Sequence, residues 1–352
     1  MRTTSRGPIA LVAALLALAA GCTAAEAPLP RATPSPTVKA TPTPTRPARP
    51  APHRPARLTH NPLTGWRPVP SGPVVAVKVD NTAAGRPQVG LDSADVVYVE
   101  EVEGGLTRLV AVYASHRPAQ VGPVRSVRSS DMELLAPYGP MALAFSGGAE
   151  NQLALFRASA LVDASPAAHP DAYARVGSRP APYNLAVDLA GLSRQVAKAA
   201  GVRDVGFRWA GAGPVPAGAA AVSRFTAVVG NTPVSFRWDA TARRWQQTVA
   251  GSVARDADGR PVSTSDVLVQ FCGVTPDYGD IDQAGSPAAF THTVGSGQAV
   301  LFRDGRRVDG TWRRSRPGDP TRFQAVSGAD LLLRPGNVWV ILAATGSALT
   351  AR

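Results

Sequence analysis

The feature that most limits what this chain can fold into is a proline-rich segment, residues 23–57, with ten prolines and six threonines. It has almost no large apolar side chains, so burial cannot offset the entropy of ordering it. Proline-rich segments are extended, and this one would reach roughly 100 Å at about 3.1 Å per residue. We therefore expect residues 22–57 to form a disordered tether, with a folded body beginning at residue 58.

Residues 1–21 have the pattern of a bacterial lipoprotein signal peptide. Arg2 and Arg6 precede twelve apolar residues, 9–20, a run that fits a signal peptide but is too short for a membrane span of about 20 residues. Small residues then lead to Cys22, as in a lipobox. The alternative is an ordinary secretory signal with an incidental cysteine. We expect acyl chains, palmitate among them, to anchor Cys22 at the outer, extracytoplasmic face of the cell membrane.

The net charge of +12 is unevenly distributed along the chain. Residues 1–57 contain eight basic residues and one acid, whereas the remaining residues contain 29 basic and 24 acidic ones. Basic residues near anionic lipid add attraction to the membrane surface. The body is only mildly basic and has no long basic run, so we do not expect it to bind nucleic acid.

The sequence lacks the local motifs of the common enzyme and metal-binding classes. Two cysteines and five scattered histidines rule out a four-cysteine metal site and local histidine pairs. Walker A, Gly-x-Ser-x-Gly and Ser-x-x-Lys motifs are also missing. Cys272 stands in an apolar run and is expected to be a buried structural thiol. We therefore expect no metal and no cofactor, and lean away from an enzyme.

Residues 58–210 predict an N-terminal domain with both strands and helices. Alternating and apolar runs predict strands at 73–79 and 141–145, and a hairpin of 96–103 with 106–113 around Gly104-Gly105. Ser130 and Glu133 have the spacing of a capping box. Helices are therefore expected over 132–138, preceded by Ser129 and Ser130, over 149–158, and over 188–200.

The second half of the sequence predicts a β-rich domain. Residues 211–222 are small and interrupted by prolines, which is typical of a linker. Asp304-Gly305 is a strong hairpin signal. The fold class is thus expected to be α+β, a mixed-sheet N-terminal domain followed by a β-rich C-terminal domain over 223–346. Strands are expected near 223–229, 233–238, 266–274, 298–303, 306–313 and 338–344.

Arginine and serine side chains gather just before the first predicted helix. Arg125, Ser126, Arg128 and Ser129 precede a helix start, where unpaired N–H groups and arginine forks would bind a phosphate, carboxylate or sulfate. Arg108 joins this candidate anion-binding set. The alternative is that the arginines pair with the protein's own acids, for which the candidates are Glu100, Glu101, Glu103 and Asp131.

Two further groups of residues are candidate contacts. Glu101 and Glu103 share one face of a predicted strand, so they are candidates for general acid–base catalysis. They would equally bind a cation or neutralise the arginines. In the loop 175–185, Arg179 and Asn184 are candidate ligand contacts, although the loop's own hydrogen bonds would occupy them just as well.

Many short motifs, in order along the chain, resemble the YerB-like bacterial lipoproteins, a family defined by a domain of unknown function. The resemblance implies a two-part α+β body outside the membrane and no established reaction. Tyr183 stands where the family pattern has histidine, which weakens an enzymatic interpretation. The motifs are Asn61-Pro62-Leu63-Thr64-Gly65, Val79-Asp80-Asn81, residues 86–91, residues 94–98, residues 102–108, residues 122–128, residues 267–270, residues 295–297 and Gly310-Thr311-Trp312-Arg313.

These observations lead to one functional hypothesis and one alternative. The first is a non-catalytic binding or assembly module, anchored through Cys22, for an anionic cell-wall polymer or another envelope protein. The alternative is an envelope hydrolase or transferase that acts on glycans and uses Glu101 or Glu103 as acid or base.

Overall fold

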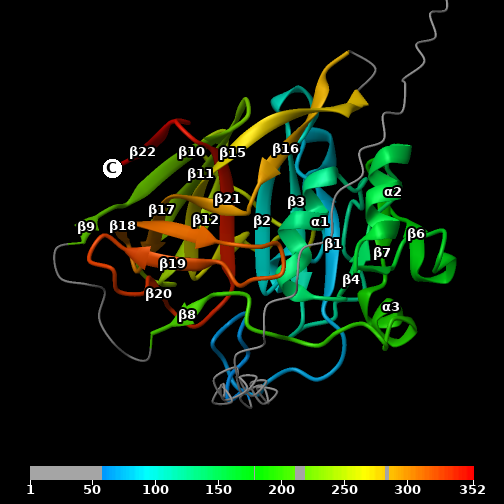
Figure 1. Ribbon diagram of the computed structural model, residues 1–352, viewed down its shortest axis with the longest axis horizontal. Coiled ribbons are helices and arrows are strands. Elements are labelled where there is room, and N and C mark those ends of the chain that lie inside the picture. The colour runs from blue at the N-terminus through cyan, green and yellow to red at the C-terminus, as the bar shows by residue number, and fades with distance from the viewer. Residues whose placement is uncertain (1–57, 178, 211–218, 282–284) are drawn as a thin grey trace, which may run out of the picture. The chain divides into compact units, whose positions relative to one another are not determined.

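The computed structural model describes residues 58–177, 179–210, 219–281 and 285–352 (Figure 1). The predicted signal peptide, Cys22, the tether and residues 211–218 of the predicted linker lie outside the described residues. Within the described residues, no helix is long and apolar enough to cross a membrane. The body, Ala56–Arg352, is one compact unit.

A large mixed sheet draws its strands from both halves of the chain. Along the sheet the order is β19-β18-β17-β15-β21-β2-β3-β1-β4-β5, while β16 pairs with β15 and β9 with β18. The strand β21 runs parallel to both of its neighbours, β2 and β15. The strands are β1 (Val75–Asp80), β2 (Val96–Glu101), β3 (Thr107–Tyr113), β4 (Ala142–Ala144), β5 (Val162–Asp163), β9 (Ala220–Ala221), β15 (Asp266–Ile281), β16 (Pro287–His292), β17 (Gly295–Arg303), β18 (Arg306–Arg314), β19 (Arg322–Ala325) and β21 (Val338–Ala344).

A second sheet and two small ones complete the strands of the described residues. The second sheet has the order β13-β12-β11-β10-β22, with β14 paired to β12. Its strands are β10 (Arg224–Val229), β11 (Thr232–Asp239), β12 (Arg244–Val249), β13 (Ser252–Val253), β14 (Ser263–Thr264) and β22 (Leu349–Ala351). The small sheets pair β8 (Arg208–Trp209) with β20 (Leu332–Leu333), and β6 (Tyr173–Arg175) with β7 (Leu185–Val187). The expected α+β class with a β-rich C-terminal part is confirmed.

Strand alternation places the core on both faces of the large sheet. Val75, Val77 and Val79 belong to one apolar cluster, while Ala76 belongs to the other. On the first face the second sheet packs through aromatic rings, and the rings of Phe225 and Phe302 stack with centroids 3.6 Å apart. Because side chains on both faces are buried, β1 has no exposed residue and any polar group on it must find a partner inside the protein.

Both predicted hairpins are confirmed. The strands β2 and β3 pair antiparallel, and the turn between them contains Gly104 and Gly105 with φ of 64° and 70°. The strands β17 and β18 are joined through Asp304 and Gly305 with φ of 50° and 69°. In the two-residue turn of β17 and β18, positive φ at both central residues matches the twist of the flanking strands, which explains why Asp-Gly stands there. Gly104 and Gly105 lie instead in the longer connection of residues 102–106.

The helices agree with prediction in position but not in their ends. Their bounds are α1 (Ser129–Leu135), α2 (Glu150–Ala158) and α3 (Leu189–Gln195), with short 3-10 helices at η1 (Ala83–Gly85), η2 (Leu91–Ser93), η3 (Glu103–Gly105), η4 (Ala136–Tyr138) and η5 (Pro170–Ala172). As expected, Asp188 caps α3 by accepting from the Gly191 N–H at 2.9 Å. However, α3 ends at Gln195 rather than at residue 200, because Val196 leaves the helical conformation.

The predicted capping box of α1 is wrong. The pair acting at this helix start is one of Arg128 and Asp131, in which the Asp131 carboxylate accepts from the Arg128 backbone N–H at 2.7 Å. The Ser130 hydroxyl instead donates to Glu100. Glu133 accepts from the backbone N–H groups of Thr293 and Val294. Tertiary partners thus take both side chains away from the helix end.

The strand β15 is longer than predicted and continues past the sheet as a ribbon with β16 (Figure 1). Its first part, to Cys272, lies between β17 and β21. Cys272 is fully buried and unpaired, as expected, and burial raises the pKa of its thiol to about 12. The later part of β15 is largely exposed and pairs only with β16 among the described residues.

Candidate anion-binding site

A fully buried set of charges lies where β1 approaches its end. The Lys78 ammonium group donates to Glu100 on β2 and, at 2.9 Å, to Asp131 on α1. All three side chains have no exposed surface. Burial and the nearby Asp131 raise the pKa of Glu100 to about 7, against the opposing pull of Lys78. This set connects β1, β2 and α1 from within, so it supports the site rather than offering a free surface.

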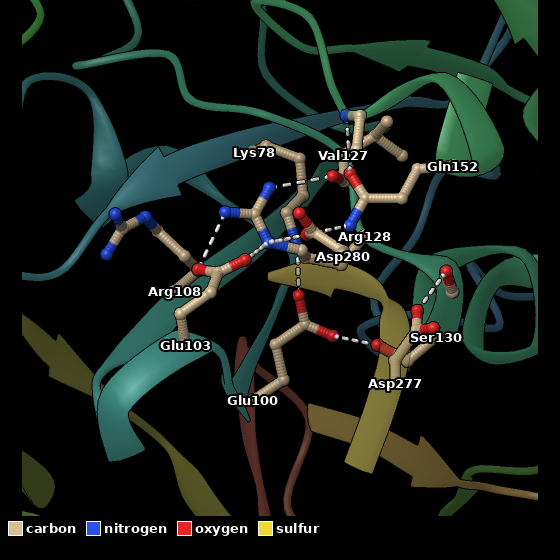
Figure 2. A network of polar contacts seen from close by, with 12 residues as sticks. Lys78, Glu100, Glu103, Arg108, Val127, Arg128, Ser130, Gln152, Asp277 and Asp280 are labelled. Atoms are coloured by element: carbon tan, nitrogen blue, oxygen red, sulfur yellow. Dashed lines mark hydrogen bonds and ion pairs between the residues drawn. The ribbon is translucent and has the colours of Figure 1, made fainter. Parts of the chain in front are cut away.

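Arg128 is held by two acids from different parts of the chain (Figure 2). Its guanidinium group forms an ion pair with Glu103 and donates to that carboxylate at 2.8 Å. Asp280, on the ribbon of β15, lies 3.6 Å from the same guanidinium. Asp280 also accepts a hydrogen bond from Gln152 on α2. Arg128 is therefore paired internally, which is the alternative that the sequence left open.

Arg125 is also paired, but with an acid that the sequence did not single out. Its Nε lies 3.2 Å from a carboxylate oxygen of Asp80, the buried last residue of β1. The guanidinium group lies 5.3 Å from the centre of the Tyr183 ring, in the range of a cation–π contact. It also reaches the Pro182 carbonyl at 3.4 Å. Tyr183 thus serves as a platform for an arginine.

Arg108 and Arg86 have no carboxylate at ion-pair distance among the described residues. Arg108 is only 6% exposed, and the one hydrogen bond of its guanidinium goes to the Thr107 carbonyl at 3.2 Å. In Figure 2 this group points away from Glu103. Arg86 donates to Asn81 at 2.9 Å, while its buried Nε has no partner. Burial lowers the pKa of both arginines, with Asp80 opposing the shift.

Of the other predicted contact residues, Arg179 bonds to the segment after β1, whereas Asn184 bonds within its own loop. Arg179 donates to the Gly85 carbonyl at 2.7 Å, so the loop 179–184 is tied to the segment after β1. Asn184 is occupied within its own loop by Arg175 and by the Arg179 carbonyl. The Ser129 hydroxyl donates to Asp277 at 2.6 Å. Ser126 is half-buried, and its hydroxyl has no partner among the described residues.

The two candidate catalytic acids have different environments. Burial would raise the pKa of Glu103, but the hydrogen bond and charge of Arg128 outweigh it and hold that pKa below its usual range. Burial raises the pKa of Glu101, which is half-buried. Glu103 is therefore held as an anion in an ion pair, a poor state for a proton donor.

Sequence reasoning missed Lys78, Asp80, Arg86 and Asp280. A lysine in the apolar run 73–79 was a readable signal, because a charge on a fully buried strand needs a partner. No such signal marked Asp80 or Asp280, since their partners are far away in the sequence. Arg86 and Arg108 lie within reach of the charge of Asp80, but no carboxylate of the described residues forms an ion pair with them or with Arg179. No cluster of histidine, cysteine and acidic side chains in the described residues would hold a metal ion.

Comparison with known proteins assigns the chain to a family. Residues 63–203 match the N-terminal domain, and residues 224–340 the C-terminal domain, of the protein of unknown function DUF3048. This chain belongs to the DUF3048 family. The two matches confirm the two-module architecture and the resemblance found in the sequence.

Two comparisons place a Bacillus subtilis protein beside this member of the DUF3048 family. The chain is 41% identical over 81 residues to "Putative lipoprotein YerB" of Bacillus subtilis, a match that spans 22% of this chain and 24% of that relative. The chain thus matches about a quarter of that relative's length. The crystal structure of the YerB protein from Bacillus subtilis superposes with a TM-score of 0.69 at 21% identity, covering 83% of this chain and 99% of that one. At this identity the structural match establishes the fold.

Proposed function

We propose that the protein is an extracytoplasmic lipoprotein, anchored to the membrane through lipidated Cys22, whose body binds an anionic ligand of the cell envelope. The anchor is supported by the apolar run and Cys22 of the sequence, and by a relative named as a putative lipoprotein. The tether 22–57 gives the body reach through a cell wall. The binding role is non-catalytic.

The observation that carries the binding role is the unpaired state of Arg108. A guanidinium group that is 6% exposed has lost most of its hydration, and the charges of Asp80 and Glu103 offset this only from beyond ion-pair distance. A buried charge without a partner is costly unless something binds it. Arginine forks recognise phosphate and carboxylate groups through two parallel hydrogen bonds. An incoming anion would supply what Arg108 lacks, with Arg86 beside the same Asp80.

The envelope hydrolase or transferase is less well supported. It needs one carboxyl group that donates a proton and one that accepts it. Glu103, held as an anion by Arg128, is not a donor at neutral pH. Glu101 alone does not supply the pair.

The test is binding of an anionic wall polymer, purified from the cells that make the protein, by calorimetry. We expect Arg108→Gln to weaken binding at least about tenfold, a loss of about 1.4 kcal/mol. Arg108→Lys should give an intermediate affinity, because it keeps the charge but loses the fork. Added salt should weaken binding by the unsubstituted protein, although less than at an exposed site.

The matched control is Arg316→Ala, which removes an arginine whose side chain is 80% exposed and pairs with Asp319. It should bind as the unsubstituted protein does. If Arg108→Gln does not fold, Arg86→Gln provides the same test at a partly exposed position. Unchanged affinity in a folded variant of Arg108 or Arg86 would contradict the proposal.

A further inference from the structure

A cavity with both polar and apolar lining lies at the opposite end of strands β2 and β3 from Arg108. It has a volume of about 540 Å³, within the range of roughly 300–1,000 Å³ that holds small-molecule ligands. Its walls come from the residues that precede β2, β15 and β21 and from those that follow β3, represented by Ser93, Ser265, Asn337 and Ser115. The six residues of β2 separate it from the arginine site by about 20 Å.

One wall of this cavity is an exposed indole ring. Trp66 is 58% exposed, whereas the other tryptophans of the described residues are buried or half-buried. It belongs to the segment after residue 58, blue in Figure 1, whose backbone is closed by a hydrogen bond from the Asn61 N–H to the Trp66 carbonyl at 2.8 Å. An exposed indole that lines a cavity provides a flat apolar surface for a ring-shaped ligand.

Another lining residue, Arg244, provides a fixed guanidinium group. Arg244 donates to the Ser263 hydroxyl at 2.8 Å and to Asn337 at 2.7 Å, so its fork is held in place before any ligand arrives. It has no carboxylate partner among the described residues. Arg67, also in the wall, is exposed and contacts His60 rather than an acid.

The acids of the cavity are already engaged elsewhere. Asp95 accepts from the Ser115 backbone N–H at 2.8 Å, and Asp92 forms an ion pair with Arg260 at 2.9 Å. Arg334, the third arginine of the wall, lies 3.6 Å from Asp304. Neither Arg67 nor Arg244 has a carboxylate at ion-pair distance among the described residues, although the charges of Asp266 and Asp92 act on Arg244 from further away.

The floor of the cavity depends on a glycine. Gly336 has a φ of 152°, and a Cβ atom there would lie 1.8 Å from the Ser265 hydroxyl oxygen. Only glycine lets this loop approach Ser265 so closely. The close approach of the Gly336 backbone to Ser265 thus fixes one part of the cavity lining.

We propose that this cavity binds an acidic sugar unit, a hexose ring that carries a carboxylate or a phosphate. The ring would stack on Trp66, the anion would bind Arg244 and Arg67, and the hydroxyl groups would bond to serine and asparagine side chains. A neutral sugar would leave the two arginines uncompensated, and a bare anion would leave the indole uncovered. The inference does not rest on the role of Arg108.

The test uses the full-length protein in detergent and follows tryptophan emission as glucuronic acid, glucose 6-phosphate, glucose or inorganic phosphate is added. We expect a blue shift with one or both acidic sugars, and which of them acts identifies the anion. Glucose and inorganic phosphate should leave the emission unchanged at the same concentration. An equal shift with glucose or with phosphate alone, or no shift with either acidic sugar, would overturn the proposal.

Variants then locate the binding by saturation-transfer NMR of the acidic sugar. Trp66→Ala should weaken binding at least fivefold, and Arg244→Gln at least tenfold. Because Arg244 also bonds to Ser263 and Asn337, Arg67→Gln provides a second charge variant at an exposed position. Arg316→Ala, at an exposed position outside this cavity, should bind the sugar normally. Unchanged binding in Trp66→Ala, or in both arginine variants, would refute the assignment.

Discussion

Lys78 carries its charge on a strand with no exposed residue, and two carboxylates offset the free-energy cost of burying that charge. Removing an ammonium group from water costs several kcal/mol, which the hydrogen bonds to Glu100 and Asp131 must offset. Replacing one of these three side chains lowers the stability of the protein more than replacing all three by apolar ones, because the remaining charges stay buried without compensation. The set also fixes α1 relative to β1 and β2, and α1 is preceded by Arg125 and Arg128.

This arrangement predicts a large effect of Lys78→Met. The substitution leaves Glu100 and Asp131 facing one another in the core, so we expect the free energy of unfolding to fall by about 3–5 kcal/mol. Urea denaturation, monitored by circular dichroism, measures this free energy of unfolding. Lys198→Met, at an exposed position, is the matched control and should change stability by less than about 0.5 kcal/mol. Equal effects of the two substitutions would contradict this account.

The residues of the candidate site were partly readable from the sequence. Arg125 and Arg128 stand before a helix, as expected, and a competing pairing with the protein's own acids was foreseen. The actual partners Asp80 and Asp280 were not, because the pairings are set by strand order and by a ribbon about 150 residues away. Short-range patterns carry no information on contacts of that separation.

Among the elements, those with a strong local period were predicted best. The hairpin of β2 and β3 follows from two apolar runs around a Gly-Gly turn. The ribbon of β15 and β16 was missed, because beyond Cys272 the strand is exposed and contains Pro276, Gly279 and acids. Its conformation is stabilised by contacts across to the helices, through Asp277 with Ser129 and Asp280 with Gln152.

Those contacts predict that Asp280→Ala loosens the ribbon. Loss of its bonds to Gln152 and Arg128 removes about 1 kcal/mol of local stability, so the β16 amides should exchange with solvent roughly five times faster. Hydrogen exchange measured by mass spectrometry resolves this segment. Asp319→Ala removes a comparable surface carboxylate paired with Arg316 and should leave β16 unchanged. Faster exchange spread over the whole body would show that the effect is global.

In the whole molecule, the strand that joins the two halves comes near the end of the chain. The strand β21, Val338–Ala344, lies between β2 and β15 and pairs with both. The α+β class and the β-rich second half could be predicted from composition and periodicity. The order of strands could not, because β2 and β21 are more than 230 residues apart and each reads only as an apolar run.

The position of β21 predicts a sharp difference between two truncations. A chain that ends at Asn337 lacks the central strand, so we expect no cooperative unfolding transition and strong binding of a hydrophobic dye. A chain that ends at Gly346 loses only β22, an edge strand of the second sheet. It should fold with reduced stability. Calorimetry on both checks the prediction, and a folded protein ending at Asn337 would contradict it.

The position of β21 in the sequence also determines when the large sheet can form during synthesis. The ribosome makes β2 and β15 before Val338, so a nascent chain that ends between residues 281 and 337 has both strands without their shared neighbour. Unpaired strand edges invite pairing with other chains, and contacts between distant segments form slowly. The large sheet therefore closes between β2 and β15 only after Val338–Ala344 has been made.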